Sequence, residues 1–304
     1  MNILKHQLLL VGAVALSAMS SVGFGAVEVV NGFGVDGWTS WDTRNTSGTQ
    51  LVGTNDTNPA GVAYFGKPAS TADDTAIQQQ IVFMGEGQTV NDAAGNTPPA
   101  SPTGSLNGLG YVRLDGTSSN SGKSDLSYVS TSGIAPASDL TSGSFSTSYT
   151  FYSESSVSPY TNREPGLNIS VIGTDTNQYT FAYTPAYNAN AWNTETATDS
   201  SGVFTVHASA SNPENGATGT LAQLAADPIY GPIMFGAGSE VWRVGFNIGS
   251  SQHYGLVYID DLQTSLLNGG DTIDFQAASV PEPASAGLLL AGGAAALMRR
   301  RKRA

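Results

Sequence analysis

The chain has 304 residues, of which only 12% are charged, a net charge of −12 and no cysteine. Without cysteine it forms no disulfides and no thiolate metal sites, and it has no thiol nucleophile. Between Glu28 and Asp274 there are 23 acidic residues against six basic ones, a net charge of about −17. Such a field repels nucleic acid and anionic membranes and attracts divalent cations, so we expect no nucleic-acid partner.

The first 25 residues have the three parts of a secretory signal peptide. Lys5 gives a short positive start, Leu8 to Leu16 form an apolar run, and small residues follow at Gly23 and Gly25. We expect Sec-type export with cleavage after Gly25, or one residue later. An uncleaved anchor is the alternative, but the apolar run is short for a bilayer span. The chain therefore divides into a signal peptide (1–25), an exported body (26–279) and a tail (280–304).

The body shows strand periodicity almost throughout. Apolar and hydroxyl residues alternate over 145–151, as in a strand with one buried face. Similar runs at Leu167–Val171 and Tyr179–Tyr183 flank a turn and predict a hairpin. Trp242–Ile248 predicts a strand with its tryptophan on the core face, and Tyr254–Leu262 predicts the antiparallel partner of that strand.

The rest of the body adds short elements of the same kind. We expect strands at Ile81–Met84, Tyr111–Leu114, Phe204–Ala208 and Thr272–Phe275, a helical turn or two at Leu221–Ala226, and a long loop over Gly85–Gly108. Many short strands with Gly- and Asn-rich connections favour an all-β fold, an antiparallel β-sandwich in one domain.

Two short segments stand near the ends of the body: Asn31-Gly32-Phe33, followed by Trp38, and the run from Tyr258 to Leu262. The first is placed like the first strand of carbohydrate-binding jelly-roll modules, and the second resembles their closing strand. The resemblance implies a jelly-roll-like sandwich. Gly34 stands where such modules often carry an acid, so the calcium site usual in that family would lack a ligand here.

The body offers little for catalysis. Only His207 and His253 remain after signal removal, and no Gly-x-Ser-x-Gly elbow is present. Acids are plentiful, but none form a run that would place two on one face of a cleft, as a glycosidase needs. We therefore expect no enzyme activity.

Two binding hypotheses remain for the body. We expect no cofactor apart from a structural calcium ion, for which Asp260 and Asp261 are oxygen-rich candidates. Since adjacent strand residues point to opposite faces, at most one of the two should join a given cluster; solvated turn charges are the alternative. Trp38 and Trp41 are candidates for stacking on a glycan, with core packing as the alternative.

The tail combines three features in fixed order. It opens with Val280, Pro281, Glu282 and Pro283, continues with an apolar stretch from Ala284 to Met298, and ends in the basic cluster Arg299, Arg300, Arg301, Lys302 and Arg303. A helix over the stretch measures roughly 22 Å, against roughly 30 Å of hydrocarbon core, and is a marginal anchor. The basic cluster should stay in the cytoplasm, leaving the body on the far side.

These features resemble the PEP-CTERM sorting domain. The resemblance implies cleavage near the Pro-Glu-Pro box by a membrane-embedded protease, the exosortase, in a bacterium with an outer membrane that makes exopolysaccharide. A permanent anchor is the alternative. Transient inner-membrane anchoring, followed by the cell surface or the medium, is the expected route.

Three functions remain open at this point. We expect a non-enzymatic structural or adhesive protein of the envelope or biofilm matrix, with exopolysaccharide as a partner. A lectin-like carbohydrate-binding module is the second hypothesis, and a secreted glycan-active hydrolase is the third.

Overall fold

The computed structural model describes residues 27–30, 37–40, 43, 52–57, 63–68, 71–104, 110–116, 123–161, 163–248, 255–267, 270 and 272–276. The signal peptide, Trp41 and the tail therefore lie outside the described residues. Among the helices of the described part, none is long and apolar enough to cross a bilayer.

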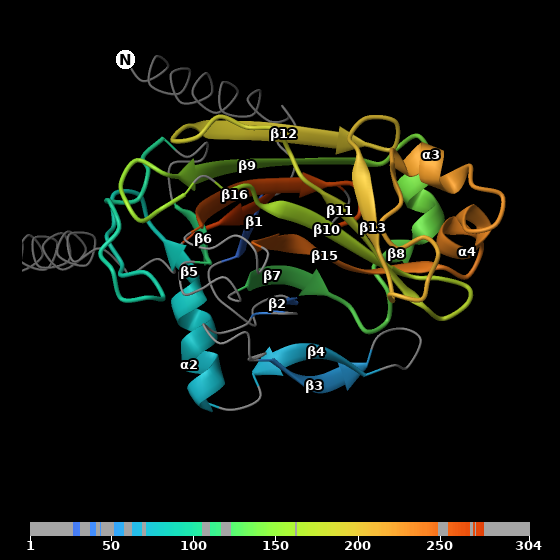
Figure 1. The fold of residues 1–304 in the computed structure, drawn as a ribbon, viewed down its shortest axis with the longest axis horizontal. Helices are drawn as coiled ribbons and strands as arrows, with labels where there is room; N and C mark the ends of the chain where they lie inside the picture. The colour runs from blue at the N-terminus through green and yellow to red at the C-terminus, as the bar shows by residue number, and fades with distance from the viewer. Residues whose placement is uncertain are drawn as a thin grey trace, which may run out of the picture.

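Two sheets packed face to face form most of the described body (Figure 1). The first sheet contains β1 (Val27–Val30), β5 (Ile81–Met84), β6 (Tyr111–Asp115), β9 (Ser146–Glu154), β12 (Trp192–Thr198), β16 (Leu256–Thr264) and β17 (Thr272–Phe275). The second contains β2 (Trp38–Thr39), β7 (Ser124–Val129), β8 (Ala135–Pro136), β10 (Gly166–Ile172), β11 (Gln178–Tyr183), β13 (Phe204–His207), β14 (Thr218–Gly219) and β15 (Glu240–Ile248). Paired strands are antiparallel, apart from β1 and β17, which run parallel.

A few further elements surround the sandwich. A separate ribbon pairs β3 (Val52–Thr57) with β4 (Ala63–Pro68), next to α2 (Thr71–Gln80). The short helices η1 (Ala137–Thr141), α3 (Leu221–Ala225) and α4 (Gly231–Phe235) gather at one end of the sandwich (Figure 1).

The inner faces of both sheets share one apolar core. Phe151 and Ile259 of the first sheet and Phe181 and Phe246 of the second belong to it, and all four are 0% exposed. The rings of Tyr149 and Phe246 meet across the two sheets at 4.9 Å. Burial of such aromatic side chains stabilises the fold in the absence of disulfides. The expected all-β sandwich is confirmed.

The expected hairpin is confirmed, but the expected partner of β15 is wrong. In the hairpin β10 pairs with β11 in the register Ile169 to Phe181. The strand expected next to β15 is β16, and it lies in the other sheet, where it pairs with β9, β6 and β17. Periodicity reports which residues share a face, but it does not identify the neighbouring strand.

The expected burial of Trp242 is confirmed, but it lies on the other face of its strand than the alternation predicts. Opposite β10, Ser170 pairs with Arg243 and Val171 pairs with Val241, so Trp242 is an extra residue that shifts the register. Its ring is fully buried, but it packs with Ile172 in a small cluster apart from the main core. The alternation predicted the same face for Trp242 as for Val244 and Phe246. A bulge exchanges the two faces of a strand, and the alternation does not show where a bulge lies.

The expected helix over Leu221–Ala226 is confirmed as α3, which begins with a capping box between Thr220 and Gln223. The helices α2 and α4 were not expected.

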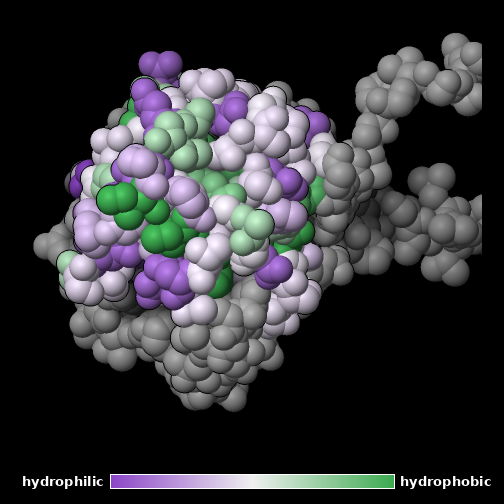
Figure 2. Space-filling model, turned by 90° about the vertical axis from the view of Figure 1, so that its right-hand side faces the viewer, coloured by the Kyte–Doolittle hydropathy of each residue, from purple (hydrophilic) through white to green (hydrophobic). Residues whose placement is uncertain are grey.

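The end of the sandwich with the short helices is partly apolar at its surface. Figure 2 shows apolar side chains interspersed with polar ones on this face. Scattered exposed apolar residues are normal, so we assign no partner to the face.

The expected loop after Gly85 is fixed to the outer face of the first sheet. The guanidinium of Arg113 donates to the carbonyls of Val90 at 2.7 Å and Asn91 at 2.9 Å. Trp192 Nε1 donates to the carbonyl of Thr103 at 3.0 Å. Residues 85–104 thus run over this face, fastened by side chains of β6 and β12.

Candidate metal centre

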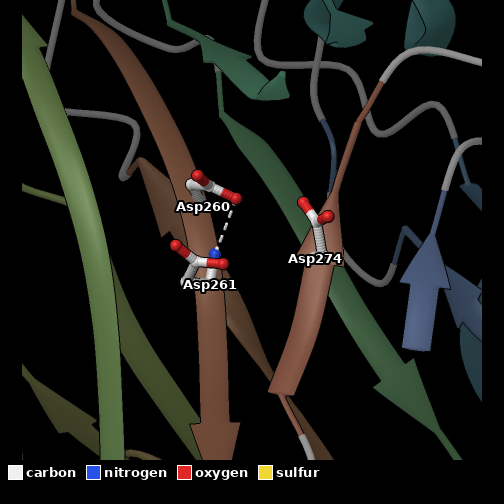
Figure 3. Close-up of side chains that lie close together, drawn as sticks. All are labelled: Asp260, Asp261 and Asp274. Carbon is white, nitrogen blue, oxygen red and sulfur yellow. Dashed lines mark hydrogen bonds between the residues drawn. The ribbon is translucent and has the colours of Figure 1, made fainter. Parts of the chain in front are cut away.

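Three aspartates meet where β16 and β17 lie side by side. Asp260 and Asp261 come from β16 and Asp274 from β17, and one carboxylate oxygen of each lies within 4.8 Å of the other two (Figure 3). The strands pair through Leu262 and Ile273, so that Asp261 and Asp274 occupy the next positions in the register. We call Asp260, Asp261 and Asp274 the aspartate cluster.

A β-bulge allows two successive residues to join the cluster. Along β9, Asp260 pairs with Thr150 and Gln263 with Ser148, which leaves one extra residue on β16. Asp261 lies in this bulge and has a φ of 51°. A left-handed backbone is tolerated by aspartate better than by most residues, and it turns the side chain away from the ordinary alternation. The expectation that only one of the two aspartates could join a cluster is therefore wrong.

The cluster is buried, and two of its carboxylate oxygens have no hydrogen-bond donor within the described residues. The exposed fractions are 0% for Asp260, 9% for Asp261 and 2% for Asp274. Asp260 Oδ1 accepts from the backbone N–H of Asp261 at 2.8 Å, and Asp274 Oδ2 accepts from Gln276 Nε2 at 3.0 Å. Within the described ranges, Asp260 Oδ2 and Asp274 Oδ1 accept no hydrogen bond. Buried carboxylate oxygens of this kind require a proton or a cation.

Other buried carboxylates of the body do have donors. Asp92 accepts from the hydroxyl of Tyr160 at 3.1 Å, and Glu154 from the backbone N–H of Ser156 at 2.6 Å. The two buried arginines pair with other acids, Arg113 with Asp115 at 3.4 Å and Arg243 with Asp125.

Less buried acids often use tyrosine hydroxyls. The pairs are Tyr179 with Asp175 at 2.8 Å, Tyr183 with Glu195 at 3.0 Å and Tyr187 with Glu164 at 3.3 Å. A chain with few basic residues thus satisfies its carboxylates by other donors. Asp260 Oδ2 and Asp274 Oδ1 of the aspartate cluster depart from this pattern.

Burial and mutual repulsion shift the ionisation of the cluster. Burial, followed by the charges of Asp261 and Asp274, raises the pKa of Asp260 to about 8. Burial also raises the pKa of Asp274. In the absence of a cation, Asp260 therefore holds a proton at neutral pH that it can share with Asp274, and a bound cation would displace this proton.

The donor set fits a hard divalent cation. Carboxylate oxygens are ligands of Ca²⁺ and Mg²⁺, and Ca²⁺ binds them at roughly 2.3–2.6 Å. Two oxygens on opposite sides of one Ca²⁺ lie roughly 5 Å apart at those bond lengths, so the 4.8 Å limit of the cluster allows all three to reach one ion. Neither thiolate nor imidazole belongs to the cluster, which disfavours softer metals.

The sequence did not identify Asp274 as a ligand. It stands at a polar position of an alternating strand, Thr272–Phe275, which was itself expected. A pairing of this strand with β16 would have placed Asp274 next to the other two, but neither that pairing nor the bulge could be read from the pattern.

Trp38 requires a correction. Its side chain is 0% exposed in the main core, where its ring meets Phe275 edge-on at 4.9 Å and Tyr128 at 6.0 Å. No face of this ring is open to a sugar, so Trp38 is not a stacking residue in this structure. Trp41 lies outside the described residues, and its role stays a prediction.

His207, one of the two histidines that remain after signal removal, is exposed on β13.

The sorting residues, from Val280 to Pro283 and from Arg299 to Arg303, lie outside the described residues. Residues 279–303 match the PEP-CTERM protein-sorting motif. The PEP-CTERM motif indicates an exported, membrane-processed protein that reaches the cell surface, with an exosortase as its processing partner. No curated protein and no solved structure matches the chain, so the resemblance to jelly-roll carbohydrate-binding modules is not confirmed.

Proposed function

We propose that this chain is a non-enzymatic surface or matrix protein of a bacterial envelope, released from the inner membrane when an exosortase cuts its tail. Its role is structural or adhesive, among exopolysaccharide. The observation that carries the proposal is the match of residues 279–303 to the PEP-CTERM motif. A cysteine-free body with a core shared between two sheets supports it, because such a body needs no oxidative folding.

The residues of the tail suit a temporary anchor. Because proline fixes φ and lacks an N–H group, Pro281 and Pro283 predict a stiff segment before the apolar stretch, one that does not extend a helix upstream. Glu282 stands as a lone anion near the start of that stretch, where a helix N-terminus favours negative charge. The stretch is too short to hold firmly, and the basic cluster keeps its end in the cytoplasm.

Cleavage of the tail is the test. Intact-mass spectrometry of protein recovered from the outer envelope and the medium should show that residues after the Pro-Glu-Pro box are missing. The double substitution Pro281→Ala and Pro283→Ala should leave full-length chain in the inner membrane. A matched double substitution of two exposed prolines of the body, Pro213→Ala and Pro228→Ala, should be processed normally. Normal trimming of the first variant, or a wild-type product that retains Arg299 to Ala304, would overturn the proposal.

A glycan-binding module is the second candidate, and one observation favours it. Trp192 on β12 and Tyr152 on β9 are only partly buried, and their rings lie 5.8 Å apart on the outer face of the first sheet. Partly exposed aromatic rings can stack on sugars. A glycan array with the exported protein would test this: specific binding that is lost in Trp192→Ala supports the module, and binding unchanged by that substitution excludes this surface. The hydrolase hypothesis stays untested.

A further inference from the structure

We propose that the aspartate cluster binds one calcium ion, which fastens β17, the last strand described, to β16. This inference concerns the body and is independent of how the tail is processed. It rests on the buried oxygens of the cluster, on their spacing and on the position of β17 in the sheet.

Two buried carboxylate oxygens of the cluster have no hydrogen-bond donor within the described residues. Asp260 Oδ2 and Asp274 Oδ1 belong to side chains that are 0% and 2% exposed, and neither accepts a hydrogen bond within the described residues. Figure 3 shows the carboxylates of Asp260 and Asp274 facing the gap between the two strands. Water has little access to such a site, so its negative charge must be met either by a proton or by a bound ion.

The spacing selects the size of the ion. One oxygen from each aspartate lies within 4.8 Å of the others. Ca²⁺ accepts six to eight oxygens in a flexible geometry, whereas Mg²⁺ requires a near-ideal octahedron with shorter bonds. Three carboxylates on two strands, one of them in a bulge, fit the flexible ion better. Further ligands would come from water or backbone carbonyls.

The position of β17 makes a cross-link there effective. Strand β17 pairs with β16 through two residue pairs only. The other neighbour of β17 is β1, the first strand described. The inner face of β17 carries Ile273 and Phe275, both in the main core. An ion on the outer face would hold Asp274 to β16 on the side opposite these core contacts, so β17 would be fixed from both faces.

The expected affinity matches an exported protein. Extracellular calcium modules bind with a dissociation constant of about 10⁻⁴–10⁻³ M, and a site with three carboxylates and the rest of its ligands weak belongs to that class. Such a site fills where calcium is millimolar, outside the cell. The ion would therefore complete the sandwich after export.

Calcium binding to the full chain tests the inference. The detergent-solubilised chain, freed of divalent ions, should bind about one calcium per chain in calorimetry with an affinity in the range of about 10⁻⁴–10⁻³ M, and its melting temperature should rise. Magnesium at the same concentration should have a much smaller effect. Asp274→Asn and Asp260→Asn should weaken calcium binding at least tenfold, whereas Asp139→Asn, an exposed acid on η1, should leave it unchanged.

A comparison of the melting temperatures of the wild type and Asp274→Asn, with and without calcium, provides the sharper test. Without calcium, Asp274→Asn should melt above the wild type, because the substitution removes repulsion in the cluster; with calcium in excess it should melt below. A variant that is less stable under both conditions, or wild-type melting unchanged at about 10 mM calcium, an order of magnitude above the expected affinity, would overturn the inference.

Hydrogen exchange of the wild type keeps the test independent of how the variants fold. Calcium should slow exchange most strongly in β16 and β17. Equal slowing in β10 and β11 of the second sheet, or no slowing at all, would also overturn the inference. Because the tail is not involved, normal or failed exosortase cleavage has no bearing on these outcomes.

Discussion

Raising the pH from 5 to 7 should destabilise the calcium-free protein, and the cause lies in Asp260. Its ordinary pKa of 3.8 is raised to about 8 in the folded chain by burial and by the neighbouring aspartates. Between these two values the folded state holds a proton that the unfolded chain has released. The contribution of Asp260 to the free energy of unfolding is therefore highest at low pH and falls as the pH rises from the ordinary pKa through the folded pKa.

The magnitude follows from linkage. One proton corresponds to about 1.4 kcal/mol per pH unit, so over two units a single group gives at most about 2.7 kcal/mol. We expect about 2 kcal/mol from Asp260, because its proton is shared with Asp274. The raised pKa of Asp274 acts in the same direction. Asp175, whose pKa is lowered, contributes stability that is lost only below its ordinary range, outside this window.

Urea unfolding followed by tryptophan fluorescence measures the effect at pH 5 and pH 7. Asp260→Asn should abolish most of the slope, and Asp139→Asn should retain it. Excess calcium should cancel or reverse the slope in the wild type, because the ion displaces the proton. An identical slope in the wild type and Asp260→Asn would refute this reasoning, because the lowered pKa of His207, which acts in the opposite direction in this window, affects both proteins alike.

Three further substitutions probe the body by the same unfolding assay. Trp38→Ala should cost about 3–5 kcal/mol through the cavity it leaves in the core, and a loss of less than about 1 kcal/mol would contradict core burial. Arg243→Ala should cost about 3–5 kcal/mol because it leaves the buried carboxylate of Asp125 without its cation. Arg243→Ala combined with Asp125→Ala should recover part of this lost stability. A double variant no more stable than Arg243→Ala would argue against the ion pair. Gly245→Ala should destabilise by at least about 1–3 kcal/mol, since its Cβ would collide with Ser127 and the carbonyl of Leu126, and wild-type stability would contradict that close approach.

The strands could be predicted from the sequence because their alternation reports a physical fact. In β10 and β11 the apolar residues recur every second position, and one face of each strand lies in the core. The same reasoning predicts β17 as a strand, but it does not predict which strands pair with it. Alternation is local, whereas the choice of neighbouring strand depends on contacts between segments far apart in the chain.

The aspartate cluster could be predicted only in part for the same reason. Asp260 and Asp261 can be identified in the sequence as two adjacent acids in a predicted strand. That both side chains join the cluster depends on a bulge that no residue type predicts. Trp38 was open to a wrong interpretation because its neighbours in sequence are small and polar. Its packing partner Phe275 comes from the last described strand, so its burial depends on a contact across the whole body.

The pairing of β1 with β17 joins the two ends of the described body and sets an order for its completion. Val27 lies opposite Thr272 and Val30 opposite Phe275, so β17 cannot be fully paired until nearly the whole body has been made and exported. Its pairing closes a loop of very high sequence separation, which is slow to form and gains little until it is complete. A cation at the aspartate cluster would stabilise this late contact, since it acts on β16 and β17 only when both are in place. The sandwich would then become most stable outside the membrane, next to the segment from which the sorting tail departs.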